Sequence, residues 1–179
     1  MAYSRHIRRS FSWACLLLLL ALPLAAQTVS MVPHVAVPDT SVFSVYVYLD
    51  SDLQDVQGVE IAMTFDNTIV RLDGIDEGDW FSDSGLERFF FDYTTAGTDT
   101  IHFTGALLHE GRTADGVLGI CNFTALAVGV SPVDFVDVDV RDSDNVDLEA
   151  AHSSGDQIII EAAIAAESLG FGDVKRLYR

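Results

Sequence analysis

Cysteine is scarce in this chain of 179 residues, which contains Cys15 and Cys121 and no others. Cys15 lies in an apolar N-terminal stretch that we expect to be removed, so Cys121 would be alone and no internal disulfide could form. This excludes a small disulfide-stapled fold, and the domain must be held together by its hydrophobic core. Because Cys121 lies in the apolar run GVLGICNFTAL, we expect a buried, unreactive thiol.

Basic residues are also few, with 10 Lys and Arg against 27 Asp and Glu. Three of the ten lie among the first nine residues, before the apolar run Ala14–Leu22, and residues 24–26 (LAA) offer a small-residue cleavage site. This order is typical of a secretory signal peptide, and the run is too short to span a membrane in the mature chain. We therefore expect cleavage near Ala26 and a protein that is secreted by a bacterium or held on its surface. The remaining 27 acidic and 7 basic residues give a net charge of −20, which disfavours nucleic acid as a partner.

Motifs of common catalytic and cofactor sites are missing as well. The sequence has no Gly-x-Ser-x-Gly elbow, no phosphate-binding loop and no His-Glu-x-x-His pair, and its histidines are dispersed. We therefore expect no enzyme, no catalytic residues and no cofactor. Asp142, Asp144 and Asp147 are spaced somewhat like calcium ligands, but the glycine and the final glutamate of an EF-hand loop are absent. We interpret them as a solvated acidic turn, with a weak calcium site as the alternative.

In place of helical periodicity, the chain up to residue 161 shows apolar alternation with a period of two. In residues 58–65 (GVEIAMTF), the residues between the apolar ones, Glu60, Ala62 and Thr64, would share the opposite face of a strand. We expect nine strands, at residues 35–37, 44–49, 59–65, 69–75, 88–94, 100–108, 116–128, 133–140 and 157–161. With Gly- and Asp-rich turns between them, they predict an all-β fold, a nine-stranded antiparallel β-sandwich of jelly-roll type.

The chain is long enough for one such domain after the signal peptide. We place the sandwich at residues 27–161. Residues 162–179 (AAIAAESLGFGDVKRLYR) read as a linker and a basic tail, because the last eight residues hold three of the seven remaining bases. The tail is either a frayed terminus or a sorting signal.

The corner formed by Asp66 and Asn67 joins two alternating runs. Asp66 could be a turn residue, because an aspartate at a strand end accepts hydrogen bonds from local backbone N–H groups. As a catalytic acid of a glycosidase it would need a second carboxylate about 5–9 Å away. We interpret Asp66, Asn67 and Gly74 as structural turn residues.

Six aromatic residues cluster within fifteen positions: Trp80, Phe81, Phe89, Phe90, Phe91 and Tyr93. Strand alternation sends either Phe90 or the set Phe89, Phe91 and Tyr93 inward. We expect core packing for most of the six, with an exposed sugar-binding platform as the alternative.

Three segments together resemble a cohesin module, the β-sandwich that receives dockerin modules in cellulosomes. They are GVEIAMTFDNTIVRLDGIDEGDWF, IHFTGALLHEGRTADGVLGICNFTAL and GVSPVDFVDVDVRDSDNVDLEAAHSSGDQIII, and the similarity covers about Met31–Glu161. The chain departs from the family in having Asn67 where a proline is usual and a short segment at His109–Thr113.

The resemblance implies a non-catalytic module that binds a protein partner, such as a dockerin-type module, in extracellular polysaccharide degradation. The partner would dock on the sheet face that includes the Glu60 strand. The residues expected to contact it are Glu60, Ala62, Thr64, His102, Thr104 and Glu110. Two alternatives stay open. One is a carbohydrate-binding module with a polysaccharide ligand, and the other is a structural or surface-anchored protein whose C-terminal tail acts as its sorting signal.

Overall fold

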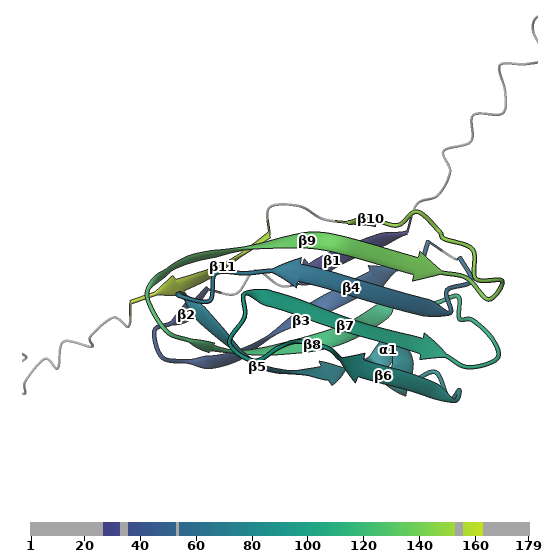
Figure 1. The fold of residues 1–179 in the computed structure, drawn as a ribbon, viewed down its shortest axis with the longest axis horizontal. Coiled ribbons are helices and arrows are strands. Elements are labelled where there is room, and N and C mark those ends of the chain that lie inside the picture. Colours follow the sequence, from purple (N-terminus) through teal and green to yellow (C-terminus); the bar gives the residue numbers. More distant parts are fainter. Residues whose placement is uncertain (1–26, 33–35, 53, 153–155, 163–179) are drawn as a thin grey trace, which may run out of the picture.

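The computed structural model describes residues 27–32, 36–52, 54–152 and 156–162 (Figure 1). The expected signal peptide and nearly all of the expected tail, residues 163–179, lie outside these ranges. None of the helical structure in the described ranges is long and apolar enough to cross a membrane.

The described residues form eleven strands and one short helix. In chain order they are β1 (Thr28–Val32), β2 (Ala36–Pro38), β3 (Val42–Asp50), β4 (Gly58–Thr64), β5 (Val70–Glu77), α1 (Asp79–Ser82), β6 (Arg88–Asp92), β7 (Thr100–Leu107), β8 (Gly116–Ala125), β9 (Gly129–Arg141), β10 (Ala151–His152) and β11 (Asp156–Glu161). A five-stranded sheet has the order β10-β1-β3-β8-β5, and a six-stranded sheet has the order β2-β11-β9-β4-β7-β6. The two sheets form two layers (Figure 1), so the predicted β-sandwich is confirmed.

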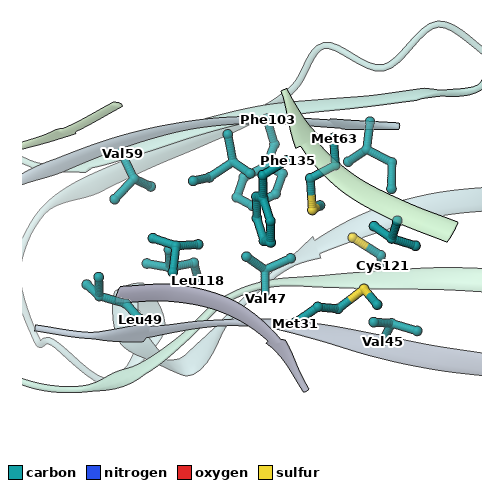
Figure 2. Close-up of a cluster of buried hydrophobic side chains, with 14 of the residues drawn as sticks. Met31, Val45, Val47, Leu49, Val59, Met63, Phe103, Leu118, Cys121 and Phe135 are labelled. Carbon is teal, nitrogen blue, oxygen red and sulfur yellow. The ribbon is translucent and has the colours of Figure 1, made fainter. Parts of the chain in front are cut away.

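The period-two pattern decides which side chains fill the space between the sheets. In the six-stranded sheet, Val59, Met63 and Phe103 are at most 3% exposed, and in the five-stranded sheet Val47 and Cys121 are at most 1% exposed. Figure 2 shows these side chains meeting in one apolar layer. Burial of apolar area at about 25 cal/mol per Å² is the main force that holds the two sheets together. The alternate residues of the same strands are left facing away from the core.

Strands β1 and β10 and helix α1 were not among the predicted elements. Helix α1 has four residues, which is too few for a helical period to show in the sequence. It buries Trp80 and Phe81, and the Trp80 indole N–H donates to the Ala114 carbonyl at 2.7 Å. Gly78 precedes the helix where a Cβ atom would collide with the Val117 carbonyl oxygen, so only glycine fits there.

The expected turn at Asp73 and Gly74 does not form, because both residues lie inside β5. The pairing of β5 with β8 shifts register between Leu72 and Gly74, which marks a β-bulge at this Asp-Gly pair. The Asp73 carboxylate accepts hydrogen bonds from the Thr124 hydroxyl and the Arg71 guanidinium. A bulge therefore absorbs the two residues that, by composition alone, favour a turn.

Candidate functional site

Four neighbouring strands of the six-stranded sheet, β6, β7, β4 and β9, turn a continuous set of side chains away from the core. We call this surface the outer face. Cross-strand pairing places its side chains in rows, which are Phe89, Ala106, Gly58 and Arg141; Phe91, Thr104, Glu60 and Asp139; Tyr93, His102, Ala62 and Asp137; and Thr100, Thr64 and Asp134. The structure thus brings five of the six proposed partner-contacting residues onto one surface.

Glu60 and His102 form the centre of the outer face. They are diagonal neighbours on β4 and β7, and Glu60 Oε1 lies 2.8 Å from His102 Nε2. Their side chains are 49% and 38% exposed. The Thr104 hydroxyl beside them donates to the Val59 carbonyl at 2.8 Å. Ala62 is the small residue opposite His102, so the pair stands open to an approaching molecule.

The remaining proposed contact residue, Glu110, lies outside the rows. It is exposed in the loop between β7 and β8. Its neighbour His109 has a φ of +82°, in the left-handed region, and His109 Nε2 lies 3.5 Å from a carboxylate oxygen of Glu87. Glu110 therefore lies in the loop beyond the end of β7, outside the rows of the outer face.

Strand β6 and Tyr93, the residue that follows it, add three aromatic side chains whose side of the sheet could not be predicted from the sequence. Phe89, Phe91 and Tyr93 are 37%, 53% and 57% exposed, and successive ring centroids are 5.6 and 6.2 Å apart. The Tyr93 ring also lies 5.5 Å from the His102 ring, which connects this aromatic row to the centre of the outer face. Phe90, between them in sequence, points inward. The prediction that most of the six clustered aromatics pack in the core is wrong for these three.

Carboxylates prevail on the β4 and β9 side of the outer face. Glu60 lies directly opposite Asp139, and like charges in this position destabilise a sheet. Arg141 donates from Nε and Nη2 to Asp139 Oδ2, at 2.9 and 2.7 Å. Asp139 Oδ1 is buried and has no hydrogen-bond partner among the described residues. A hollow of about 350 Å³ lies beside these side chains and is lined in part by Gly58 and Ala106.

Asp66 lies in the turn between β4 and β5. Its Oδ1 accepts hydrogen bonds from the Thr68 backbone N–H at 2.9 Å and from the Thr68 hydroxyl at 2.6 Å. These bonds stabilise the charged form and hold the pKa of Asp66 below its usual value. A general acid needs a raised pKa, so this environment suits a turn residue and not a catalytic acid. Asn67 follows in the same turn and is exposed.

The acidic segment that follows β9 forms local turns. Asp142 Oδ1 accepts hydrogen bonds from the backbone N–H groups of Asp144 and Val146, and Asp147 Oδ1 accepts one from Glu149. Asp144 is exposed. Within the described ranges, no group of three or more His, Cys, Asp or Glu side chains is placed to hold a metal ion. The carboxylates of Asp142 and Asp147 thus cap backbone N–H groups.

Cys121 is a free thiol in β8, and it is 1% exposed. Burial is the main cause that raises its pKa to about 12. The expected burial of Cys121 is confirmed. Because the thiolate is the reactive species, a raised pKa also favours the expected unreactive thiol.

Comparison with known proteins finds similarity in structure alone. No protein-family model matches the sequence, and no curated protein matches it. A non-cellulosomal cohesin from the archaeon Archaeoglobus fulgidus superposes with a TM-score of 0.65 at 16% identity, over 82% of this chain and 99% of that one. A chain of a type I cohesin–dockerin complex from Clostridium thermocellum gives a TM-score of 0.66 at 13% identity, over 77% of this chain and 95% of that one. The seventh ScaB type I cohesin of Pseudobacteroides cellulosolvens gives 0.65 at 15% identity, over 79% and 96%.

The resemblance stated from the sequence therefore extends to the whole sandwich. The chain has the cohesin fold, although it is only 13–16% identical in sequence to these three chains.

Proposed function

We propose that this chain is a secreted, non-catalytic binding module that docks a protein partner, of the dockerin type, on its outer face. Such a module would assemble proteins that degrade extracellular polysaccharide. The observation that carries the proposal is the outer face itself, in which the register of four strands aligns an exposed Glu60–His102 pair with an aromatic row.

Two further observations support this function. Solved chains of the same fold come from cohesin–dockerin complexes, so the sandwich is one that carries protein docking elsewhere. The outer face also presents its groups on a rigid sheet whose other side is the hydrophobic core, which limits the conformational cost of binding. We propose export because, in residues 1–26, basic residues are followed by an apolar run and then by a small-residue cleavage site.

Affinity capture tests the proposal. The whole chain, immobilised, is exposed to the exported proteins of its source organism, and the captured protein is identified and its Kd measured by calorimetry. Glu60→Arg reverses a charge at the centre of the outer face and is expected to weaken binding at least about tenfold, a typical hot-spot effect. Asp76→Arg is the matched control, because Asp76 is an exposed carboxylate on β5 of the other sheet.

Equal loss in both variants, or no loss in either, would place the binding site elsewhere. Failure of the wild-type chain to capture any protein would remove protein docking as its function.

A further inference from the structure

In the part of the chain that the structure describes, each sheet ends in two edge strands, whose free backbone N–H and C=O groups can pair with another chain. Three of the four edges carry features that hinder such pairing. Strand β2 has three residues and ends at Pro38, β10 has two residues, and β5 contains the bulge at Asp73 and Gly74. Strand β6, at the rim of the six-stranded sheet (Figure 1), has five residues (RFFFD) and pairs with β7 without a break in register. It is therefore the edge best suited to accept a further strand.

The hydrogen bonds between β6 and β7 determine which backbone groups of β6 are left over. Leu108 N–H donates to the Glu87 carbonyl at 2.7 Å, and Tyr93 N–H donates to the His102 carbonyl at 2.8 Å, one at each end of β6. In an antiparallel pair, residues that bond to the neighbouring strand alternate with residues whose backbone groups point away. The odd-numbered residues of β6 therefore bond to β7. The residues whose N–H and C=O groups point to the free edge are Arg88, Phe90 and Asp92.

The sequence of β6 is complementary to itself when a second copy runs antiparallel to it. Pairing of Phe90 with Phe90 of the second copy puts Arg88 opposite Asp92, and Asp92 opposite Arg88. All three residues direct their backbone groups to the free edge, so this register makes about six backbone hydrogen bonds, two for each facing pair. Opposite charges that face each other across strands stabilise the pairing, whereas like charges destabilise it. A shift by two residues in either direction would separate these charges.

The charged side chains of β6 are available for these contacts, since Arg88 and Asp92 are both exposed. Arg88 donates from Nε and Nη2 to the Glu77 carboxylate on β5, and its Nη1 takes part in neither bond. Asp92 Oδ1 accepts the Thr94 backbone N–H at 2.8 Å, which leaves Oδ2 for a guanidinium group. The Arg88 guanidinium can therefore bridge Glu77 and the carboxylate of a second copy.

On the outer face, the same register joins the aromatic rows of the two copies. Phe89 then lies opposite Phe91 of the second copy, at a position where the backbone groups of the two strands do not pair. Side chains approach most closely at such positions, with Cβ atoms about 4.5–5.5 Å apart. Phe89 and Phe91 are 37% and 53% exposed in the single chain. The pairing therefore removes apolar area from water at two symmetric contacts.

We infer that two copies of this chain associate through β6, in an antiparallel pair centred on Phe90 that joins the two six-stranded sheets into one. The dimer does not depend on the proposed docking partner, and it leaves Glu60 and His102 open, because they lie on β4 and β7 and not on the shared edge. The paired strands are short, so the contact falls among transient interfaces. We expect a reversible dimer with a Kd on the order of 10 µM.

Analytical ultracentrifugation measures the association. The chain, purified after export, is sedimented at about 1 to 300 µM in about 0.15 M salt, which screens the repulsion between two acidic molecules. The sedimentation coefficient is expected to rise with concentration from that of a monomer to that of a dimer. A monomer at every concentration would overturn the inference.

Hydrogen exchange locates the contact in the wild-type chain. The Phe90 amide points to the free edge, so its exchange is expected to be fast in the monomer and at least about tenfold slower at concentrations where the dimer prevails. The Phe91 amide is bonded to β7 and is expected to be protected at both concentrations. A dimer in which the Phe90 amide exchanges as fast as in the monomer would place the contact elsewhere and overturn the inference.

Charge variants test the register. Arg88→Glu leaves only carboxylates at the two charge pairs, and Asp92→Arg leaves only guanidinium groups, so each variant is expected to dimerise at least about tenfold more weakly than the wild type. An equimolar mixture of the two variants restores opposite charges in both pairs and is expected to form a heterodimer with about the wild-type Kd. Arg71→Glu and Asp76→Arg make the same changes in charge at exposed positions of β5 and should leave the Kd unchanged.

Thermal melting first establishes that each variant is folded. Weakening that the mixture does not reverse would reject the antiparallel register, and equal weakening in the β5 variants would show an effect of overall charge and not of the β6 edge. If Arg88→Glu or Asp92→Arg does not fold, the exchange of the Phe90 amide in the wild-type chain decides alone.

Discussion

Substitution of Gly105 by alanine tests the packing that supports the outer face from within. Gly105 is an inward residue of β7, opposite Phe90 of β6. A Cβ atom at this position would lie 2.5 Å from Phe81 Cζ and 2.9 Å from Phe81 Cε1. The Phe81 ring has little room to move, because the Trp80 ring lies 4.9 Å away and the Phe90 ring 5.9 Å away.

The expected cost follows from two opposing effects. Overpacking of a core costs about 1–3 kcal/mol. Alanine in place of glycine in a strand gains about 0.5–1 kcal/mol, because less backbone entropy is lost on folding. From the midpoints of the two ranges we expect Gly105→Ala to lower the free energy of unfolding by about 1 kcal/mol, and the melting temperature by about 2–4 °C for a domain of this size.

A double-mutant cycle identifies the cause. Phe81→Leu removes the end of the ring that the new methyl group would meet. If the contact accounts for the loss, Gly105→Ala should cost at least about 1 kcal/mol less in the Phe81→Leu background than in the wild type. Urea denaturation gives all four free energies of unfolding, with a constant m-value as the check on two-state behaviour. Additive effects within about 0.5 kcal/mol, or a stabilised Gly105→Ala, would refute this account of the core.

Three other expectations concern single groups. Asp66→Ala should destabilise the protein at pH 7, because it removes both hydrogen bonds that the Asp66 carboxylate accepts from Thr68. The pKa of Asp66 is lowered in the folded state, so the stabilisation by its carboxylate is present above the unfolded pKa near 4 and is lost as the pH falls through the folded value. Unfolding curves of the variant and the wild type should therefore converge in acid. Cys121, whose pKa burial raises to about 12, should react with a thiol reagent such as DTNB in urea and not in the native protein, and fast native labelling would contradict its burial. Millimolar calcium should leave the melting temperature unchanged, since the carboxylates of Asp142 and Asp147 cap backbone N–H groups, and a rise reversed by EDTA would restore the calcium hypothesis.

The strands and the fold class could be predicted because a strand that is buried on one side has apolar residues at every second position. Residues 58–64 show this directly, since the predicted outward set, Glu60, Ala62 and Thr64, lies on the outer face. The same reasoning missed α1, which is one turn long, and placed a turn at Asp73 and Gly74, where β5 instead contains a bulge. Composition alone does not separate a bulge from a turn.

The aromatic row could not be assigned from the sequence because both sides of β6 carry phenylalanine, Phe90 on one side and Phe89 and Phe91 on the other. Which side of β6 faces the core depends on its pairing with β7. Phe90 lies opposite Gly105, the one inward position of β7 without a side chain, and this leaves room for rings in the core. That pairing joins residues fifteen positions apart and requires the register between the strands. The opposition of Glu60 and Asp139 depends in the same way on the pairing of β4 with β9.

Footprinting of the captured complex tests the central claim most directly, namely that the outer face is the docking surface. Hydroxyl radicals label exposed rings, and the chain offers an internal comparison, since Tyr93 and His102 lie on the outer face while Tyr46 lies on the outward side of the other sheet. Binding of the partner is expected to suppress labelling of Tyr93 and His102 and to leave Tyr46 as reactive as in the free chain. Protection of Tyr46 with Tyr93 and His102 still labelled would contradict the account.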